Sequence, residues 1–126
     1  MQDKFSPYNA NLLPVGFEYP DKYLNISAHN NLPNGFVWWF EDANTEGSKL
    51  AWELRSAYKD WFNIGDRNLI PFAQFNDDVA FFDGNDTTGN PRVIVIDLGN
   101  KKRSYELLDF DVWLCEALKE SKSKKK

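Results

Sequence analysis

The chain of 126 residues has only one cysteine, the residue whose disulfides stabilise many secreted domains, and it has no long apolar segment. Its single cysteine, Cys115, excludes an internal disulfide and fits a reducing compartment. The longest apolar runs are far too short to span a bilayer. Residues 1–16 have no cationic start followed by an apolar stretch, so we expect no signal peptide. These absences predict a soluble, cytoplasmic protein that does not act in a membrane.

The sequence also lacks the residues from which catalytic and cofactor sites are usually built. His29 is the only histidine, and no cysteine or second histidine lies near it to complete a metal site. No serine stands in a Gly-x-Ser-x-Gly motif, and no glycine-rich loop with a lysine precedes a helix to hold phosphate. Cys115 follows Trp113 and Leu114, where we expect a buried small side chain rather than a nucleophile. We therefore predict no enzyme activity and no cofactor.

One acidic loop, residues 83–91, holds several potential ligands for a hard cation. Residues 83–87 resemble the start of a calcium loop. The sixth position, however, is Thr88 where a glycine is required, and the twelfth is Ile94 where a glutamate is required. Asp and Asn also favour turns because their side chains hydrogen-bond the local backbone. We expect no metal ion in this loop.

The net charge of −4 conceals an uneven distribution. Residues 121–126 contain four lysines and no acid. The rest of the chain has 11 basic and 19 acidic residues, which gives it a formal charge of −8. Such a body repels nucleic acid and attracts a basic partner. We expect residues 1–120 to form one domain and residues 121–126 to be a disordered, solubilising tail.

Aromatic residues make up 16% of the chain and supply large side chains for a core. Two aromatic-rich runs, residues 69–75 and 78–83, flank a polar turn at Asn76 and Asp77, which predicts an antiparallel hairpin. Pro71 indicates that the first run is an edge strand or begins after this residue. No residue in this hairpin is of a type and setting that suggests catalysis.

Further strands follow the hairpin. Residues 92–98 form the most β-branched run, which predicts a strand buried on both faces. Residues 101–106 return as the next strand, and residues 36–40 form an aromatic strand earlier in the chain. Residues 19–24 open a short helix with Pro20 at its first position. A last helix begins after Asp109, a good N-cap.

Residues 48–62 are the clearest helix in the sequence. An apolar stripe runs along it, formed by Leu50, Leu54, Ala57, Tyr58 and Trp61. Trp52 lies nearly opposite this stripe. We expect it to be covered by another segment, to stack on Arg55, or to be exposed for a partner. The elements together predict an α+β fold, in which helices cover one face of a twisted antiparallel meander.

A binding surface is the function that these features favour. Carboxylates occur on the predicted meander turns and strand ends, at Asp77, Asp78, Asp83, Asp86 and Asp97. Together they would raise the association rate with a basic partner, although any single one is also explained as part of a solvated rim. Trp39 and Trp52 are the candidate aromatic anchors of this surface.

The order of the motifs resembles the SUKH superfamily over residues 13–118. Residues 20–24 are similar to its early helix, residues 69–83 to its central hairpin, residues 93–96 to its next strand and residues 108–114 to its closing helix. The resemblance implies an α+β fold without catalysis. Many bacterial members of this superfamily look like immunity proteins that bind and silence toxins, often nucleases. It has no common set of functional residues, so the resemblance implies none here.

From the residues and the resemblance we expect a non-enzymatic, cytoplasmic binding protein. The leading hypothesis is an immunity protein that neutralises a basic toxin, for example a nuclease, through an acidic surface around the hairpin tip and the 83–91 loop. The alternative is a regulatory interaction domain with an endogenous partner.

Overall fold

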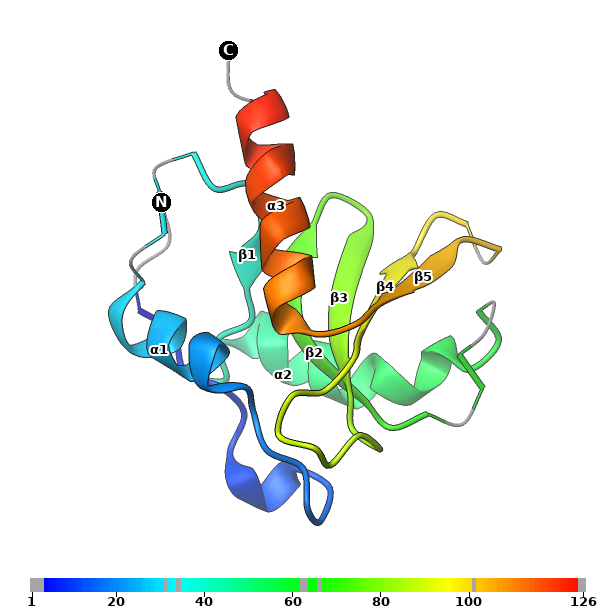
Figure 1. The fold of residues 1–126 in the computed structure, drawn as a ribbon. Helices are drawn as coiled ribbons and strands as arrows, with labels where there is room; N and C mark the ends of the chain where they lie inside the picture. Colours follow the sequence, from blue (N-terminus) through cyan, green and yellow to red (C-terminus); the bar gives the residue numbers. More distant parts are fainter. Residues whose placement is uncertain are drawn as a thin grey trace.

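The computed structural model describes residues 4–30, 32–33, 35–61, 64–65, 67–100 and 102–124, in which five strands form one antiparallel sheet (Figure 1). The strands are neighbours in chain order and form a meander: β1 (Trp39–Phe40), β2 (Leu69–Phe75), β3 (Asp78–Asp83), β4 (Val93–Asp97) and β5 (Ser104–Leu107). The helical segments are η1 (Ala10–Leu12), α1 (Asp21–His29), α2 (Glu46–Leu54), η2 (Arg55–Tyr58) and α3 (Phe110–Lys124). The predicted α+β class is confirmed.

The predicted hairpin forms β2 and β3. Phe75 pairs with Asp78 at its closed end, and Asn76 in the turn has a φ of 54°. Asparagine tolerates this left-handed conformation better than most residues do. The register shifts between Pro71 and Ala73, so the proline lies at a bulge, where its missing N–H is tolerated.

Helices α1 and α3 pack on one face of the sheet, where aromatic rings build the larger core. Phe72 and Phe82, on adjacent strands, stack with ring centroids 4.1 Å apart. Trp113 of α3 meets Phe72 edge-on at 4.8 Å, and Tyr23 of α1 meets Phe82 edge-on at 5.2 Å. These geometries suit the quadrupoles of aromatic rings, which makes the packing directional as well as apolar.

The opposite face of the sheet is covered as well. Phe81, Ile94 and Ile96 form a second core cluster, against which Tyr58 and Trp61 pack from the α2–η2 side. Figure 1 places α3 in front of the sheet and α2 behind it. The expectation that helices cover one face only is therefore wrong in this detail. Its cause is that β4 has apolar side chains on both faces, so both faces need cover.

The predicted helix 48–62 is shorter and oriented differently from the expectation. It begins at Glu46, ends as an α-helix at Leu54 and continues as 3₁₀ turns to Tyr58. Leu50 and Leu54, expected in the core, are about half exposed. Trp52 is instead half-buried against Tyr8, at 4.7 Å, because the N-terminal segment packs on this side of the helix.

The last helix is longer than the sequence predicts. Although residues 121–126 were expected to be disordered, α3 continues to Lys124, and positions 125–126 lie outside the described residues. The buried Ser121 hydroxyl donates to Ala117 O at 2.9 Å and accepts from Val37 N at 3.0 Å. Cys115 is exposed on this helix rather than buried.

Candidate protein-docking surface

The five predicted aspartates do not form one surface. Asp77, Asp78 and Asp97 lie at one end of the sheet, where Asp78 and Asp97 are partners across β3 and β4. Asp83 and Asp86 lie at the other end of β3. Asp78 and Asp83 are five residue steps apart along β3, a distance of about 17 Å. The five aspartates, predicted as one cluster, therefore form two groups at opposite ends of the extended strand β3.

The aspartate at position 86 holds its own loop together. Asp86 accepts hydrogen bonds from the Thr88 hydroxyl at 2.6 Å, Thr88 N at 3.1 Å and Arg92 N at 3.2 Å. Burial, the largest single effect, raises the pKa of Asp86, but the hydrogen bonds from Thr88 and Arg92 together outweigh it, so the pKa is lowered. The side-chain oxygens of Asp83 and Asp97 likewise accept bonds from backbone N–H groups two residues ahead. Local turn formation thus explains much of this acidity.

Two carboxylates at the hairpin tip, one at the end of β4 and one on α3 form the acidic tip, defined as Asp77, Asp78, Asp97 and Glu120. Burial raises the pKa of Asp78, Arg103 opposes that shift, and the other three carboxylates add to it. Asp97 also forms an ion pair with Arg103 at 2.9 Å. The tip is therefore a concentration of negative charge that one described cation only partly balances.

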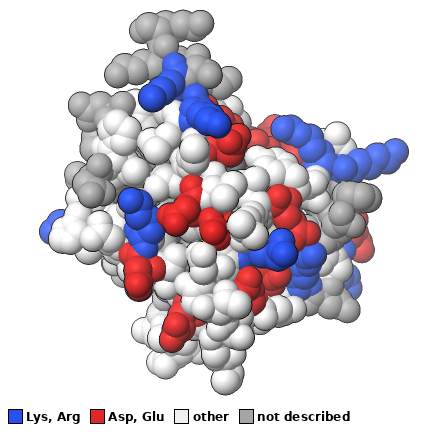
Figure 2. Space-filling model, in the orientation of Figure 1, with Lys and Arg blue, Asp and Glu red and all other residues white. Residues whose placement is uncertain are grey.

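Helix α3 contributes carboxylates that the sequence prediction missed. Figure 2 shows Asp and Glu side chains across the middle of the face that α3 covers, with Lys and Arg mainly toward its margins. Glu116 is exposed, and Glu120 is half-buried and accepts a bond from the Trp38 indole at 3.0 Å. Their spacing of four residues, which places them on one helix face, was the available signal.

The two predicted aromatic anchors differ in exposure. Trp39 on the edge strand β1 is 55% exposed. Cross-strand pairing places it in line with Gln74, Val79 and Ile96, on the face of the sheet that α2 partly covers. Trp52 is half-buried, and its ring lies 4.7 Å from that of Tyr8, so its partner-binding role stays a prediction.

Between α2 and the sheet lies an apolar groove of about 160 Å³. Three of its walls are leucines with large exposed fractions, Leu50 at 54%, Leu54 at 43% and Leu98 at 41%. Tyr58, Pro71 and Val79 also line it. We call this region, together with Trp39, the α2 groove. Sequence periodicity failed to find it because it assigned the leucine stripe to the core.

A buried carboxyl group lies at the groove. Glu41, which follows β1, lines the groove and is 5% exposed, and its Oε1 accepts a 2.6 Å bond from the Ser48 hydroxyl. Burial raises the pKa of Glu41, and the bond from Ser48 partly opposes this shift. Glu41 N donates to Phe72 O at 2.9 Å, which fixes this residue to β2.

The α2 groove and the acidic tip meet at Asp77. Leu98, a wall of the groove, donates its backbone N–H to Asp77 O at 2.8 Å. Asp78 and Asp97 alternate with Val79 and Ile96, so they point to the face that α3 covers, and Asp77 is the tip residue that is bonded to the groove wall. This places apolar contact area beside negative charge, which is the usual composition of an interface anchor and its rim.

Within the described part of the chain, no three His, Cys, Asp or Glu residues are placed to hold a metal ion. Nor does any described helix combine the length and apolarity needed to cross a membrane. Comparison with known proteins found no matching family model, curated protein or solved structure.

Proposed function

We propose that this chain is a non-enzymatic protein-binding domain whose docking surface is the α2 groove with the adjoining acidic tip. The observation that carries the proposal is that three leucines, each between 41% and 54% exposed, line one groove, with the exposed Trp39 paired to Gln74 at its side. Clustered apolar exposure of this kind marks interaction sites, whereas isolated exposed leucines need no explanation.

The groove supplies enough apolar surface to anchor a partner. Complete burial of a leucine-sized side chain from full exposure contributes about 1.5–3 kcal/mol. Trp39, Leu50, Leu54 and Leu98 are each near half exposure, so covering all four contributes roughly 3–6 kcal/mol before association costs. The acidic tip adds mainly to the association rate and to the choice of a basic partner.

Within this class we propose an immunity protein that acts in the cytoplasm and neutralises a basic toxin, for example a nuclease. Two features support this. The body without its last six residues has a formal charge of −8, opposite to the cationic sites with which nucleases bind phosphate. The motif order also resembles that of the SUKH superfamily. A regulatory domain with an endogenous partner is the second candidate, and the same surface would serve it.

Co-expression with candidate toxins tests the proposal, with cell survival and complex formation as readouts. Leu54→Lys places a cation in the groove and should abolish rescue from a toxin that the wild type neutralises. Leu24→Lys is the matched control, because Leu24 is also helical and 40% exposed but lies on α1. Equal rescue by both variants would exclude the groove as the docking site.

The division of the aspartates supplies a second pair of variants. Asp77→Lys reverses a charge beside the groove, whereas Asp83→Lys makes the same change at the other end of β3. We expect the first to slow association and the second to leave it nearly unchanged, with the difference shrinking as salt is added. The opposite ranking would assign docking to the 83–91 loop.

A further inference from the structure

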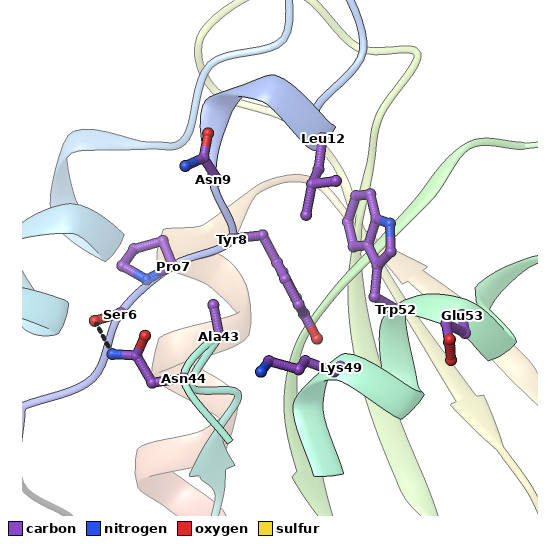
Figure 3. Close-up of a pocket in the computed structure, with 10 residues that line it drawn as sticks. All are labelled: Ser6, Pro7, Tyr8, Asn9, Leu12, Ala43, Asn44, Lys49, Trp52 and Glu53. Carbon is purple, nitrogen blue, oxygen red and sulfur yellow. Dashed lines mark hydrogen bonds between the residues drawn. The ribbon is translucent and has the colours of Figure 1, made fainter. Parts of the chain in front are cut away.

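A second concavity lies on the other side of α2, away from the groove. It is a pocket of about 550 Å³, within the range of small-molecule sites, formed between the N-terminal segment and α2 (Figure 3). Its main walls are Pro7, Tyr8, Leu12, Asn44, Lys49 and Trp52. Helix α2 separates the two concavities, because Lys49 and Trp52 line the pocket whereas Leu50 and Leu54 line the groove.

The walls of the pocket are held in place by hydrogen bonds. Tyr8 is buried and donates its hydroxyl to Ser48 O at 2.5 Å, which ties the N-terminal segment to α2. Ala43 N donates to Ser6 O at 2.8 Å, and the Asn44 amide donates to the Ser6 hydroxyl at 3.1 Å. A pre-formed site loses less conformational entropy on binding than one that must be assembled.

The apolar wall is aromatic. The rings of Tyr8 and Trp52 lie 4.7 Å apart at an angle of 43°. The Arg55 guanidinium lies 4.1 Å from the centroid of the Trp52 ring and holds the indole from the helix side. Leu12 is 48% exposed beside these rings. This wall accepts an apolar side chain or ring, and the stacked Arg55 excludes a second cation from the same indole face.

The polar side chains that line the pocket point in different directions. In Figure 3 the Lys49 ammonium points toward Asn44, whereas the Glu53 carboxylate lies beyond Trp52 and points away from the other lining side chains. Lys49 also pairs with Glu46 at 3.5 Å, but both side chains are largely exposed, so this pair is weak. The Asn44 amide nitrogen is engaged by Ser6, and its side-chain oxygen remains to accept a further bond.

We propose that this pocket binds an apolar carboxylic acid that also carries an amide N–H, as at the C-terminus of a peptide ending in an apolar residue. Lys49 attracts the carboxylate, the Asn44 side-chain oxygen accepts from the amide N–H, and the apolar side chain lies on Tyr8, Trp52 and Leu12. A cation is disfavoured because Lys49 is the charge that points into the site. This binding does not depend on the α2 groove or on any toxin.

Three small probes separate the contributions of these groups. N-acetylphenylalanine has the carboxylate and the amide, N-acetylphenylalaninamide lacks the charge, and 3-phenylpropionate lacks the N-acyl amide. Binding is measured by the NMR shift of the Trp52 indole N–H, assigned with a Trp52→Phe variant. We expect N-acetylphenylalanine to bind with a Kd of about 1 mM, and both other probes to bind about fivefold more weakly.

Variants of the full chain identify the residues responsible. Lys49→Gln should remove the preference for the acid over the amide, while Lys59→Gln, an exposed lysine outside the pocket, should retain it. Leu12→Ser changes an exposed side chain and should weaken all three probes without loss of folding.

Each alternative outcome counts against a stated part of the proposal. Absence of any shift up to about 10 mM, tenfold above the expected Kd, would overturn the site. Equal binding of the acid and the amide, or an unchanged preference in Lys49→Gln, would overturn the role of Lys49. Equal binding of 3-phenylpropionate would overturn the peptide-like ligand and leave only a free apolar acid.

Discussion

Substitution of Ser48 by alanine removes only one hydroxyl group, but we expect it to destabilise the protein substantially. The Ser48 side chain is 4% exposed, donates to Glu41 Oε1 at 2.6 Å and accepts from Asp42 N at 2.9 Å. Alanine keeps the bonds that the Ser48 backbone makes to Thr45 and Tyr8. The substitution therefore isolates the hydroxyl that joins α2 to the end of β1.

The size of the expected loss follows from the Glu41 carboxylate and Asp42 N, which both lose the Ser48 hydroxyl as a hydrogen-bond partner. A hydrogen bond to a charged group contributes about 1.5–3 kcal/mol, and a buried N–H deprived of its acceptor costs about 1 kcal/mol or more. The higher helix propensity of alanine offsets roughly 0.5 kcal/mol of this loss in the free energy of unfolding. We predict a net loss of about 2–3.5 kcal/mol in the free energy of unfolding at pH 7. Ser56→Ala, an exposed serine in η2, should change it by less than about 0.5 kcal/mol.

The loss should also depend on pH with a defined sign. Burial raises the pKa of Glu41 in the folded state, and the Ser48 bond partly opposes that rise. A raised folded-state pKa favours folding below the unfolded-state pKa, and this contribution disappears as the pH rises through the folded-state pKa. Ser48→Ala removes the opposing bond and raises the folded-state pKa further. Its destabilisation should therefore be larger at pH 7 than near the usual pKa of a glutamate.

Urea unfolding at both pH values provides the assay, with Glu41→Gln completing a double-mutant cycle. Glu41→Gln should increase stability at neutral pH, because no charge is then buried, and should make the Ser48→Ala loss smaller and independent of pH. A Ser48→Ala loss below about 0.5 kcal/mol at pH 7, or an equal loss with and without Glu41, would refute the coupling.

Three further predictions concern other parts of the fold. Gly84→Ala should cost more than about 2 kcal/mol in thermal unfolding, since a Cβ there would lie 2.5 Å from Asn68 O. Asp86→Ala should cost about 1–2 kcal/mol and increase hydrogen exchange in the 83–91 loop, because three hydrogen bonds are lost. Trp39→Ser should change stability by less than about 1 kcal/mol yet weaken partner binding at least tenfold, since its ring is mostly exposed. A wild-type result in any of these assays would contradict the corresponding role.

The meander was predictable because its determinants are local. The turn at Asn76, the aromatic-rich runs on either side of it and the β-branched run of β4 each specify strands without reference to distant residues. The N-cap at Asp109, which accepts from Val112 N at 3.0 Å, is equally local and was also predicted correctly.

The orientation of α2 was not predictable from its own residues. Its leucine stripe satisfies the rule for a core-facing helix, yet the N-terminal segment packs against Trp52 on the opposite side. That contact joins Tyr8 to a residue far along the chain, and periodicity within one helix contains no information about it. The same limitation concealed the groove that Leu50 and Leu54 line.

The arrangement of the carboxylates depends on strand direction. Asp77 and Asp83 are close in sequence, but an extended strand carries them to opposite ends of the sheet. Glu120 joins the first group from α3, more than 40 residues after Asp77 and Asp78 in the chain, through packing that no local pattern encodes. Residue types at the site were therefore predictable, whereas their grouping was not.

The most direct test of the docking surface is the dissociation constant of a toxin that the wild type neutralises, measured against the two leucine variants. We predict that Leu54→Lys weakens binding at least tenfold, because it removes an apolar anchor and opposes a basic partner. Leu24→Lys, equally exposed on α1, should bind within about twofold of the wild type. Equal affinity of both variants, or a loss confined to Leu24→Lys, would contradict docking at the α2 groove.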